Sequence, residues 1–204
     1  GNMEVYKLTG NPAYYDYSNQ WCEHNRWRGA NSDDKRNWKY KTYGEGQDFV
    51  LFGDWQICFQ TYIDMYHLNP ADYKVARAKE VMSYACHMNE NKFWWWSDAM
   101  VMVMPLMTKM YKLTGDKMYL DRLYENYLWS DSLMYDAEAQ LYYRDAKYIY
   151  PKVKTTCGGK SFWARGDGWV LAGLAKVLQD LPKDSKYRPF YVKRFQQLAE
   201  GVAR

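Results

Sequence analysis

A turn motif recurs four times along the chain and predicts four corners between helices. "YKLTGNPAYY" begins at Tyr6, "YHLNPADY" at Tyr66, "YKLTGDKMYL" at Tyr111 and "LPKDSKYRPFY" at Leu181. Each copy has a leucine, then a turn sequence, then a tyrosine shortly afterwards. Glycine ends helices by adopting a left-handed conformation, and proline cannot continue a helix. Each copy therefore marks a tight corner.

The segments on either side of the corners have helical periodicity. The segment before the third corner, "AMVMVMPLMTKMY", is apolar nearly all round, which is typical of a buried helix. Its Pro105 predicts a kink or the first turns of that helix. The segments after the corners, such as "DKMYLDRLYENY", carry more charge. The order of buried helix, corner and amphipathic helix repeats along the chain. This repetition predicts a toroid of helical hairpins, in which outer helices surround the inner ones.

Three connections between the hairpins are long, at about 28–48, 89–97 and 133–160. Loops of such length in a compact domain are usually functional. The last one contains "DSLMYDAEAQLYYRDAKYIY", whose alternating stretches indicate a small β-hairpin.

Three aspartates stand in register with the corners. Asp54, Asp98 and Asp167 each precede the corner leucine by about four turns of helix, or roughly 21 Å. If the inner helices run parallel around a ring, these carboxylates gather at one mouth together with the ends of the long loops. The alternative is simple helix capping, because aspartate is a favoured N-cap residue and suits the positive end of a helix dipole. Ser97 would also serve as a cap for the helix of Asp98.

Aromatic residues gather beside the same three acids. The chain has 21 Tyr and 10 Trp, more than packing requires, and their flat faces with polar edges suit sugars or peptides. Core packing is the alternative for any single tryptophan. Trp94, Trp95 and Trp96 cannot all point the same way on a regular backbone, so at least one of them is expected in the core.

Arg165 lies between Trp163 and Trp169 in "FWARGDGW". A guanidinium held between aromatic rings is well suited to bind a carboxylate. The alternative is an ion pair with Asp167 or another acid. The neighbouring glycines allow a tight turn into the helix, but the segment lacks the GxxxxGK pattern of a phosphate-binding loop.

Several classes of function find no support in the sequence. The net charge of +4 is spread along the chain, which argues against nucleic acid and leaves an anionic substrate open. The four cysteines show no CxxC spacing and the three histidines form no ligand pair, so we expect reduced thiols and no metal site. No apolar run is long enough to span a bilayer, and no signal peptide is present. The compartment stays unknown, either periplasmic or cytoplasmic in a bacterium.

Four blocks carry a family resemblance. "FGDWQICFQTYIDMY", "WWWSDAMVMVMPLMTKMYKLTGDKMYLD", "LYYRDAKY" and "FWARGDGWVLAGLAKVLQDLP" resemble successive blocks of glycoside hydrolase family 105. This family comprises unsaturated rhamnogalacturonyl and glucuronyl hydrolases and is related to family 88. The most specific patterns are W-x-R-G-x-G-W and W-x-D-x-x-x-M. The resemblance implies an all-α (α/α)6 toroid, with residues 1–204 forming one partial domain of that fold.

The resemblance also implies a reaction on lyase-generated oligosaccharides that end in a 4,5-unsaturated uronic acid. In the family an aspartate protonates C4 and activates water for attack at C5, and the resulting hemiketal collapses to release the remaining sugar. The reaction departs from the usual two-carboxylate scheme and needs no metal or other cofactor. Carried over by motif, Asp98 matches the acid/base and Asp54 the second pocket aspartate. The remaining residues that we expect to bind substrate are Trp163, Arg165, Trp169, Trp96, Trp55, Asp167 and Arg144.

Three positions depart from the family pattern. Asp167 stands where the family commonly has asparagine, Trp55 where a smaller polar residue is common, and Arg144 where some relatives have histidine. The first change adds negative charge close to an anionic substrate, and the third changes a polar contact.

The length and the hairpin count lead to a further expectation. Six hairpins need more residues than this chain has, since it carries about three and a half hairpins, or about seven helices. We therefore expect a partial barrel whose remainder comes from sequence outside the chain. Two other functions stay open: another α/α-toroid carbohydrate enzyme, such as an epimerase or an ordinary glycosidase, and a non-catalytic module that binds a glycan or a partner. An epimerase would be expected to place paired histidines at the mouth, and a binding module would not depend on Asp98.

Overall fold

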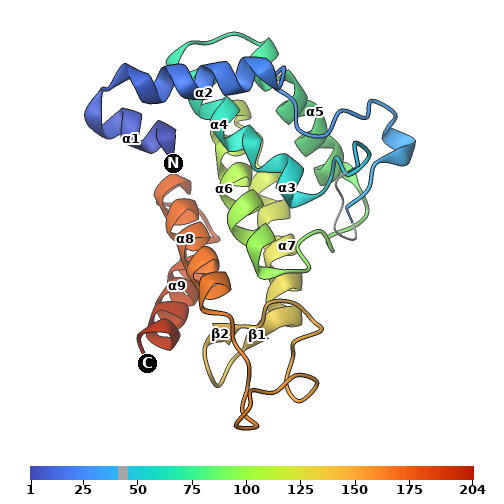
Figure 1. The fold of residues 1–204 in the computed structure, drawn as a ribbon, viewed down its shortest axis with the longest axis vertical. Helices are drawn as coiled ribbons and strands as arrows, with labels where there is room; N and C mark the ends of the chain where they lie inside the picture. The colour runs from blue at the N-terminus through green and yellow to red at the C-terminus, as the bar shows by residue number, and fades with distance from the viewer. Residues whose placement is uncertain (41–45) are drawn as a thin grey trace. The chain divides into compact units, whose positions relative to one another are not determined.

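The computed structural model describes residues 1–40 and 46–204 of the chain. Two compact units are present, Gly1–Met88 and Asn89–Arg204, and both are built mainly of α-helices (Figure 1). Within the described residues, no helix is both long and apolar enough to cross a membrane.

The first unit is a set of helical hairpins around α4. Its helices are α1 (Asn2–Thr9), α2 (Pro12–His24), the short α3 (Gly53–Gln56), α4 (Cys58–Leu68) and α5 (Tyr73–His87). A 3-10 turn at Lys35–Asn37 lies in the connection between α2 and α3. Helix α4 packs against α1, α2 and α5. It buries Tyr62, Ile63 and Met65 completely, which makes it the central helix of this unit.

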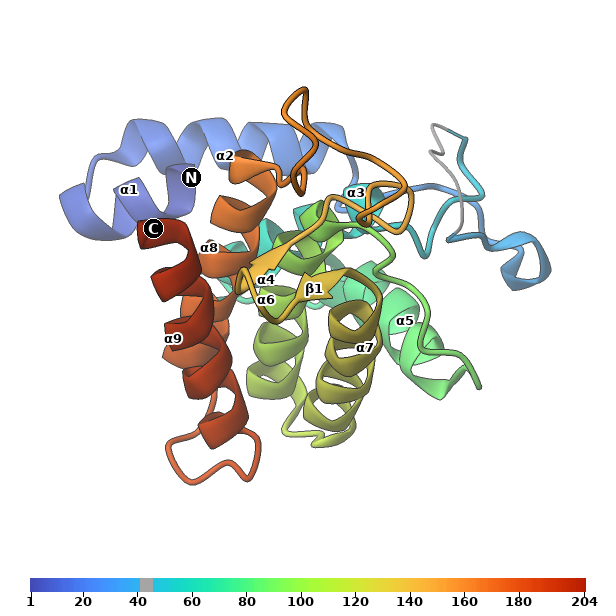
Figure 2. The same cartoon turned by 90° about the horizontal axis from the view of Figure 1, so that it is seen from below.

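The second unit places four helices side by side. They are α6 (Ser97–Thr114), α7 (Met118–Met134), α8 (Ala164–Asp180) and α9 (Arg188–Ala203). Helix α6 packs against α7 and α8, and α8 packs in turn against α9, as both views show (Figures 1 and 2). The predicted hairpin is confirmed: β1 (Tyr135–Asp136) pairs antiparallel with β2 (Leu141–Tyr142), and Tyr135 lies opposite Tyr142.

All four predicted corners lie between consecutive helices. Gly10 ends α1 and Gly115 ends α6, with φ angles of 67° and 75° that favour glycine. The other two corners follow α4 and α8, which end at Leu68 and Asp180. The glycine and proline signals therefore located these helix ends correctly, because such signals act within a few residues.

Helices α6 and α8 approach closely in the second unit. A Cβ atom added at Gly173 of α8 would lie 2.6 Å from Cε of Met104 and 3.2 Å from Cα of Val101, both on α6. The side of α6 that faces its neighbours is rich in methionine. Its methionines with no more than 2% exposure are Met100, Met104, Met107 and Met110. Pro105 is buried inside α6, and the helix continues on both sides of it.

Candidate active site

Asp98 lies in the first turn of α6, one residue after the helix begins at Ser97. The capping alternative is not what the structure has, because Trp96 occupies the N-cap position and no side chain caps this helix. The N–H of Ser97 instead donates to the carbonyl oxygen of Arg144 at 2.9 Å. This bond joins the start of α6 to the segment after β2.

The carboxyl of Asp98 is half-buried, and its burial raises its pKa above the ordinary value. The guanidinium groups of Arg165 and Arg144 act in the opposite direction, because positive charge favours the carboxylate. The net shift is upward. Asp98 therefore combines a strengthened hold on its proton with two cations that suit an anionic ligand.

Arg165 is the second residue of α8, and its exposed side chain lies against a tryptophan. Its guanidinium carbon is 4.4 Å from the ring centroid of Trp163. Trp169, on the same helix, is 43% exposed. Over the described residues, no ion pair joins Arg165 to Asp167. The structure therefore leaves the guanidinium of Arg165 at the surface over an aromatic face, which suits contact with a ligand carboxylate.

Asp167 is more deeply placed than its neighbours in the motif. It is 2% exposed, and burial raises its pKa to about 6. Its Oδ1 accepts the backbone N–H of Tyr142 at 2.7 Å, which lowers the pKa somewhat. The side chain thus ties α8 to β2, and this geometry favours an anchoring role over direct contact with substrate.

Gly166 allows the starts of α8 and α6 to meet. A Cβ atom at this position would lie 2.7 Å from Oγ of Ser97 and 2.7 Å from the ring of Trp163. The glycine therefore brings the Arg165 motif close to the turn that carries Asp98.

The tryptophan run before α6 divides between core and surface. Trp94 and Trp96 are 2% and 4% exposed, whereas Trp95 is half-buried and its ring lies 4.6 Å from that of Trp96. The expectation that at least one of the three belongs to the core is confirmed. Trp96 also forms an isolated antiparallel bridge with Asp145. Of the two rings, Trp95 offers more surface to a ligand than the predicted Trp96.

Arg144 leaves the small sheet beside this bridge and is half-buried. Its Nη1 pairs with Oδ2 of Asp145 at 2.9 Å, and its guanidinium lies 5.3 Å from the ring centroid of Tyr148. In the second unit, Arg144 and Arg165 therefore lie close enough to Asp98 to interact with its charge, and Trp163 lies against Arg165.

Asp54 and Trp55 belong to the first unit, where both lie in α3. Asp54 is exposed and Trp55 is half-buried, and together they border a pocket of about 350 Å³. The other residues lining this pocket are Trp21, Asn25, Arg28, Gly29, Ile57, Cys58 and Thr61. A Cβ atom at Gly29 would lie 2.1 Å from the carbonyl oxygen of Trp55, so only glycine permits this approach.

Sequence patterns missed two polar or aromatic residues of this pocket. Trp21 is 42% exposed at the end of α2, and Arg28 lies in the long connection that follows. Arg28 pairs with Asp33. Neither residue belongs to a repeated corner or to a family block. The length of the connection was a signal for Arg28, and no sequence pattern marked Trp21.

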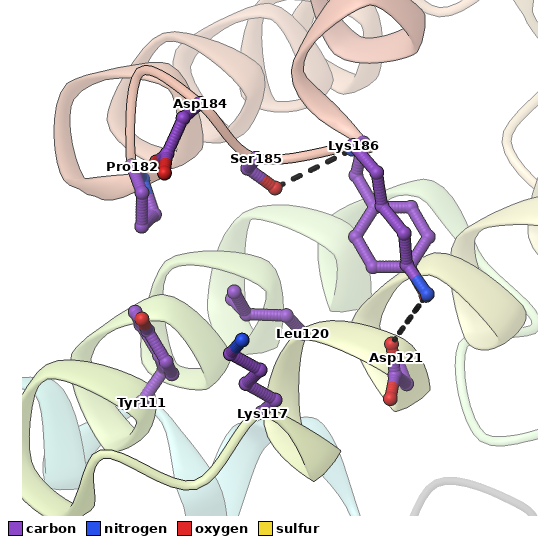
Figure 3. Close-up of a pocket in the computed structure, with 9 residues that line it drawn as sticks. Tyr111, Lys117, Leu120, Asp121, Pro182, Asp184, Ser185 and Lys186 are labelled. Atoms are coloured by element: carbon purple, nitrogen blue, oxygen red, sulfur yellow. Dashed lines mark hydrogen bonds and ion pairs between the residues drawn. The ribbon is translucent and has the colours of Figure 1, made fainter.

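A second pocket lies at the opposite end of α6 and α8 from Asp98 and Arg165 (Figure 3). It measures about 380 Å³, and its lining comes from the third and fourth corners. Asp121 borders it, accepts the hydroxyl of Tyr187 and lies 3.5 Å from Nζ of Lys186. The pocket is therefore separate from the group around Asp98. Among residues 1–40 and 46–204, no cluster of three acidic, histidine or cysteine side chains is arranged to hold a metal ion.

Curated relatives match part of the chain. An unsaturated 3S-rhamnoglycuronyl hydrolase of Formosa agariphila is 36% identical over 113 residues, which cover 53% of this chain and 30% of the relative. An enzyme of the same description from an Alteromonas species is 27% identical over 135 residues, 66% of this chain and 31% of the relative. The matched regions thus span about a third of the length of these relatives.

Solved structures match nearly the whole chain. One described as "Polysaccharide Lyase BACCELL_00875" is 59% identical, with a TM-score of 0.97, covering 99% of this chain and 57% of the other. A glycosyl hydrolase family 88 protein from Bacteroides vulgatus is 52% identical, with a TM-score of 0.97, covering 99% and 58%. The chain therefore spans just over half the length of these two structures.

A more distant structure bears on the fold alone. A family 105 glycoside hydrolase of C. acetobutylicum has a TM-score of 0.72 at 18% identity, covering 98% of this chain and 57% of the other. The all-α class and the partial α/α toroid predicted from the sequence are confirmed by this shared fold. The predicted relation to family 88 is confirmed as well. The model for "Glycosyl Hydrolase Family 88" matches residues 1–204, and the chain belongs to that family.

Proposed function

We propose that this chain carries part of the active site of a hydrolase that removes a terminal 4,5-unsaturated uronic acid from oligosaccharides. The main support is the raised pKa of Asp98 beside two guanidinium groups. A carboxyl group whose pKa is raised keeps its proton to higher pH, which suits it to act as a general acid. Two curated relatives are described as unsaturated 3S-rhamnoglycuronyl hydrolases, which are hydrolases of this chemical class.

In the proposed reaction, Asp98 gives its proton to C4 of the unsaturated ring. Positive charge then develops at C5 and is shared with the ring oxygen. The Asp98 carboxylate next takes a proton from a water molecule, whose oxygen bonds to C5. This step restores the acid and leaves a hemiketal. The hemiketal opens to a ketone at C5, which leaves the former ring oxygen as a hydroxyl on C1. The hemiacetal at C1 then collapses to an aldehyde, its hydroxyl proton passes to the departing oxygen, and the linked sugar leaves as an alcohol.

Three aromatic or basic side chains of the second unit are proposed to hold the uronic ring. Arg165 and Arg144 are suited to its carboxylate, and Trp163 to an apolar face of the ring. Trp169 extends the exposed aromatic surface on α8, and Trp96 supports Trp95 from the core. Asp167 is proposed to act indirectly, through its bond to Tyr142.

Asp54 and Trp55 are proposed as substrate-binding residues of the first unit. Both border a pocket large enough for a sugar ring, and this pocket also contains the exposed ring of Trp21. Asp54 is assigned to positioning the ring. We also propose that residues 1–204 form one partial toroid domain.

The acid/base role of Asp98 is tested by replacing it with asparagine. Asp98→Asn retains the size of the side chain but has no proton to give to C4, so turnover is expected to fall by about 100-fold or more. The measurement follows loss of the ultraviolet absorbance of the conjugated C4=C5 double bond, using the full-length protein and lyase-generated oligosaccharides. Thermal unfolding checks that the variant is folded. Unchanged turnover would remove Asp98 from the acid/base role, whereas a wild type that turns over none of the unsaturated oligosaccharides would favour a non-catalytic glycan-binding module.

A second candidate function is a polysaccharide lyase. The observation that favours it is the 59% identity to a structure described as a polysaccharide lyase. Such an enzyme would remove the proton at C5 of a saturated uronate and expel the group at C4, thereby creating the double bond. Arg144 and Arg165 would assist by neutralising the carboxylate, which makes the C5 proton more acidic.

The two functions change the same absorbance in opposite directions. The full-length protein is incubated separately with intact uronic acid polysaccharides and with unsaturated oligosaccharides. A hydrolase lowers the absorbance of the unsaturated oligosaccharides and leaves the intact chains unchanged. A lyase raises the absorbance of the intact chains. A rise with intact chains and no loss with the unsaturated products would overturn the hydrolase proposal.

A further inference from the structure

We infer that Asp131 is a positioning residue for the site around Asp98, acting through the hydroxyl of Tyr142. The inference depends on the proposed function for its meaning in catalysis. It goes further by assigning a task to a largely buried polar cluster that joins α7, β2 and α9, outside the substrate-binding residues. The cluster consists of Asp131, Tyr127, Tyr142 and Arg194.

The cluster is held together by short hydrogen bonds. Oη of Tyr142 donates to Oδ1 of Asp131 at 2.6 Å, and the hydroxyls of Tyr142 and Tyr127 are 2.7 Å apart. Because Tyr142 gives its proton to the carboxylate, Tyr127 is the donor between the two phenols. Nη2 of Arg194 completes the cluster by donating to Oδ2 of Asp131 at 2.7 Å. Both phenols are at most 1% exposed, so the loss of one partner would leave a polar group buried.

Tyr142 is also held at its backbone. Its N–H donates to the carboxyl of Asp167 on α8. The side chain of Tyr142 is thus bound to α7 and its main chain to α8. Strand β2, which ends at Tyr142, takes its position from both helices at once.

The segment after Tyr142 links the position of β2 to that of Asp98, the candidate acid. Two residues later, the carbonyl oxygen of Arg144 accepts the N–H of Ser97, which directly precedes Asp98. The next residue, Asp145, forms the bridge with Trp96. A continuous path of hydrogen bonds and backbone therefore joins Asp131 to the first turn of α6. The same path sets the place of the Arg144 guanidinium, which lowers the pKa of Asp98.

A small displacement along this path has a measurable consequence. Misplacement of a reacting group by about 1 Å can cost roughly 100-fold in rate, even when its cause is remote. If β2 loosens, Arg144 moves away from Asp98 and its opposing effect on the pKa weakens. We therefore expect a lower rate together with a rise in the pKa of Asp98. Substrate affinity changes less than the rate, because Arg144 shifts but Arg165 on α8 keeps its place.

Helix α7 itself offers a matched control. Asp121 also accepts a tyrosine hydroxyl, from Tyr187, and also has a cation nearby, Lys186 (Figure 3). It lies at the corner end of α7, beside the second pocket, and none of its bonds leads to β2. Asp121→Asn therefore removes a comparable carboxylate from the same helix without touching the proposed path.

The test compares Asp131→Asn and Tyr142→Phe with Asp121→Asn in the full-length protein. We expect the first two to lower kcat by about tenfold or more, with KM changed by a smaller factor than kcat. The alkaline limb of their pH profile is expected to move upward by about half a unit or more. Asp121→Asn is expected to leave all three quantities unchanged. Thermal unfolding identifies a variant that does not fold; Asp131→Asn keeps an acceptor for Tyr142 and is the milder change.

A second readout is independent of turnover. The carboxyl carbon of Asp98 is titrated by NMR in the wild type and in both cluster variants, with Asp98→Asn providing the assignment. A rise of the pKa in the cluster variants, absent from Asp121→Asn, supports the inference even if the wild type acts on none of the saccharides. Folded cluster variants with the wild-type pKa of Asp98 would overturn it. So would wild-type kcat and pH profile in those variants, if the wild type is active.

Discussion

Asp98 owes its chemical character to a balance between burial and charge. Half-burial raises its pKa, while Arg165 and Arg144 hold the rise in check. A general acid is most effective when its pKa lies near the working pH. The two arginines therefore have two effects: they suit an anionic substrate, and they limit the rise in the pKa of Asp98.

Replacing Arg165 by glutamine is expected to separate these two effects. The loss of its positive charge lets the pKa of Asp98 rise further, so Asp98 keeps its proton to higher pH. The alkaline limb of kcat then moves to higher pH, and KM rises because the substrate carboxylate loses a partner. Both changes are measured in pH-dependent kinetics of the full-length protein. Arg122→Gln serves as the control, because Arg122 is half-buried on α7 and paired with Glu125, and it should shift neither.

Asp167 carries a stability cost that depends on pH. Its pKa in the folded protein is about 6, above the ordinary value of 3.8. Between these values the folded state holds a proton that the unfolded chain releases, so stability falls as pH rises through this window. The cost is complete above about pH 6.

The expected outcome for Asp167→Asn is therefore a gain in stability at neutral pH of up to about 3 kcal/mol. Asparagine keeps an acceptor for the N–H of Tyr142 and has no charge to bury. The gain should vanish below about pH 4, where the aspartate is protonated in both states. Thermal unfolding as a function of pH provides the measurement. Asp180→Asn, which removes the partner of Lys112, should bring no gain; a pH-independent effect of Asp167→Asn would contradict the assignment.

At the scale of elements, the contact of α6 with α8 determines how closely the two motifs approach. Gly173 lies at this contact, where a Cβ atom meets both a side chain and the backbone of α6. Gly168 belongs to the same helix, and a Cβ atom there would meet nothing within 4 Å. Comparing the two positions therefore distinguishes the steric need for glycine at a helix contact from the ordinary destabilising effect of glycine within a helix.

The substitution of alanine at the two positions should change the free energy of unfolding by different amounts. Gly168→Ala is expected to raise it by about 1 kcal/mol, because alanine favours the helix. Gly173→Ala is expected to lower it by about 1–3 kcal/mol relative to Gly168→Ala, because the added methyl forces α6 and α8 apart. Urea unfolding measures both values. Equal gains at the two sites would show that the contact tolerates a methyl group.

Local signals in the sequence predicted the helices and their ends well. The roles of some side chains were not predicted, because they depend on contacts between residues far apart in the chain. Gly10 and Gly115 act within one turn of helix, so the corners were predictable from the residues beside them. Asp167 was grouped with Asp98 by its register, yet its partner is Tyr142, which lies 25 residues away. Asp131 belongs to no repeated pattern at all. Its contacts depend on the packing of α7, β2 and α9, which no single segment encodes.

At the scale of the whole molecule, the chain spans just over half of the two solved structures that it matches most fully among those described. A site walled by several hairpins needs its other walls to exclude water and hold substrate. We expect residues 1–204 expressed alone to lose turnover that a protein of the relatives' length retains. Parallel assays under one set of conditions measure this loss. Equal turnover by the two would mean that the residues described above suffice.

The methionine lining of α6 has a consequence for the durability of the second unit. A thioether becomes a polar sulfoxide when an oxidant reaches it, and a polar sulfur no longer fits a tightly filled interior. Met100 and Met104 are fully enclosed, so peroxide can reach them only during moments when the helices separate. Each such event would leave a polar sulfoxide in the interior and make the next separation easier, so oxidation of this unit should accelerate unless a reductase restores the methionine.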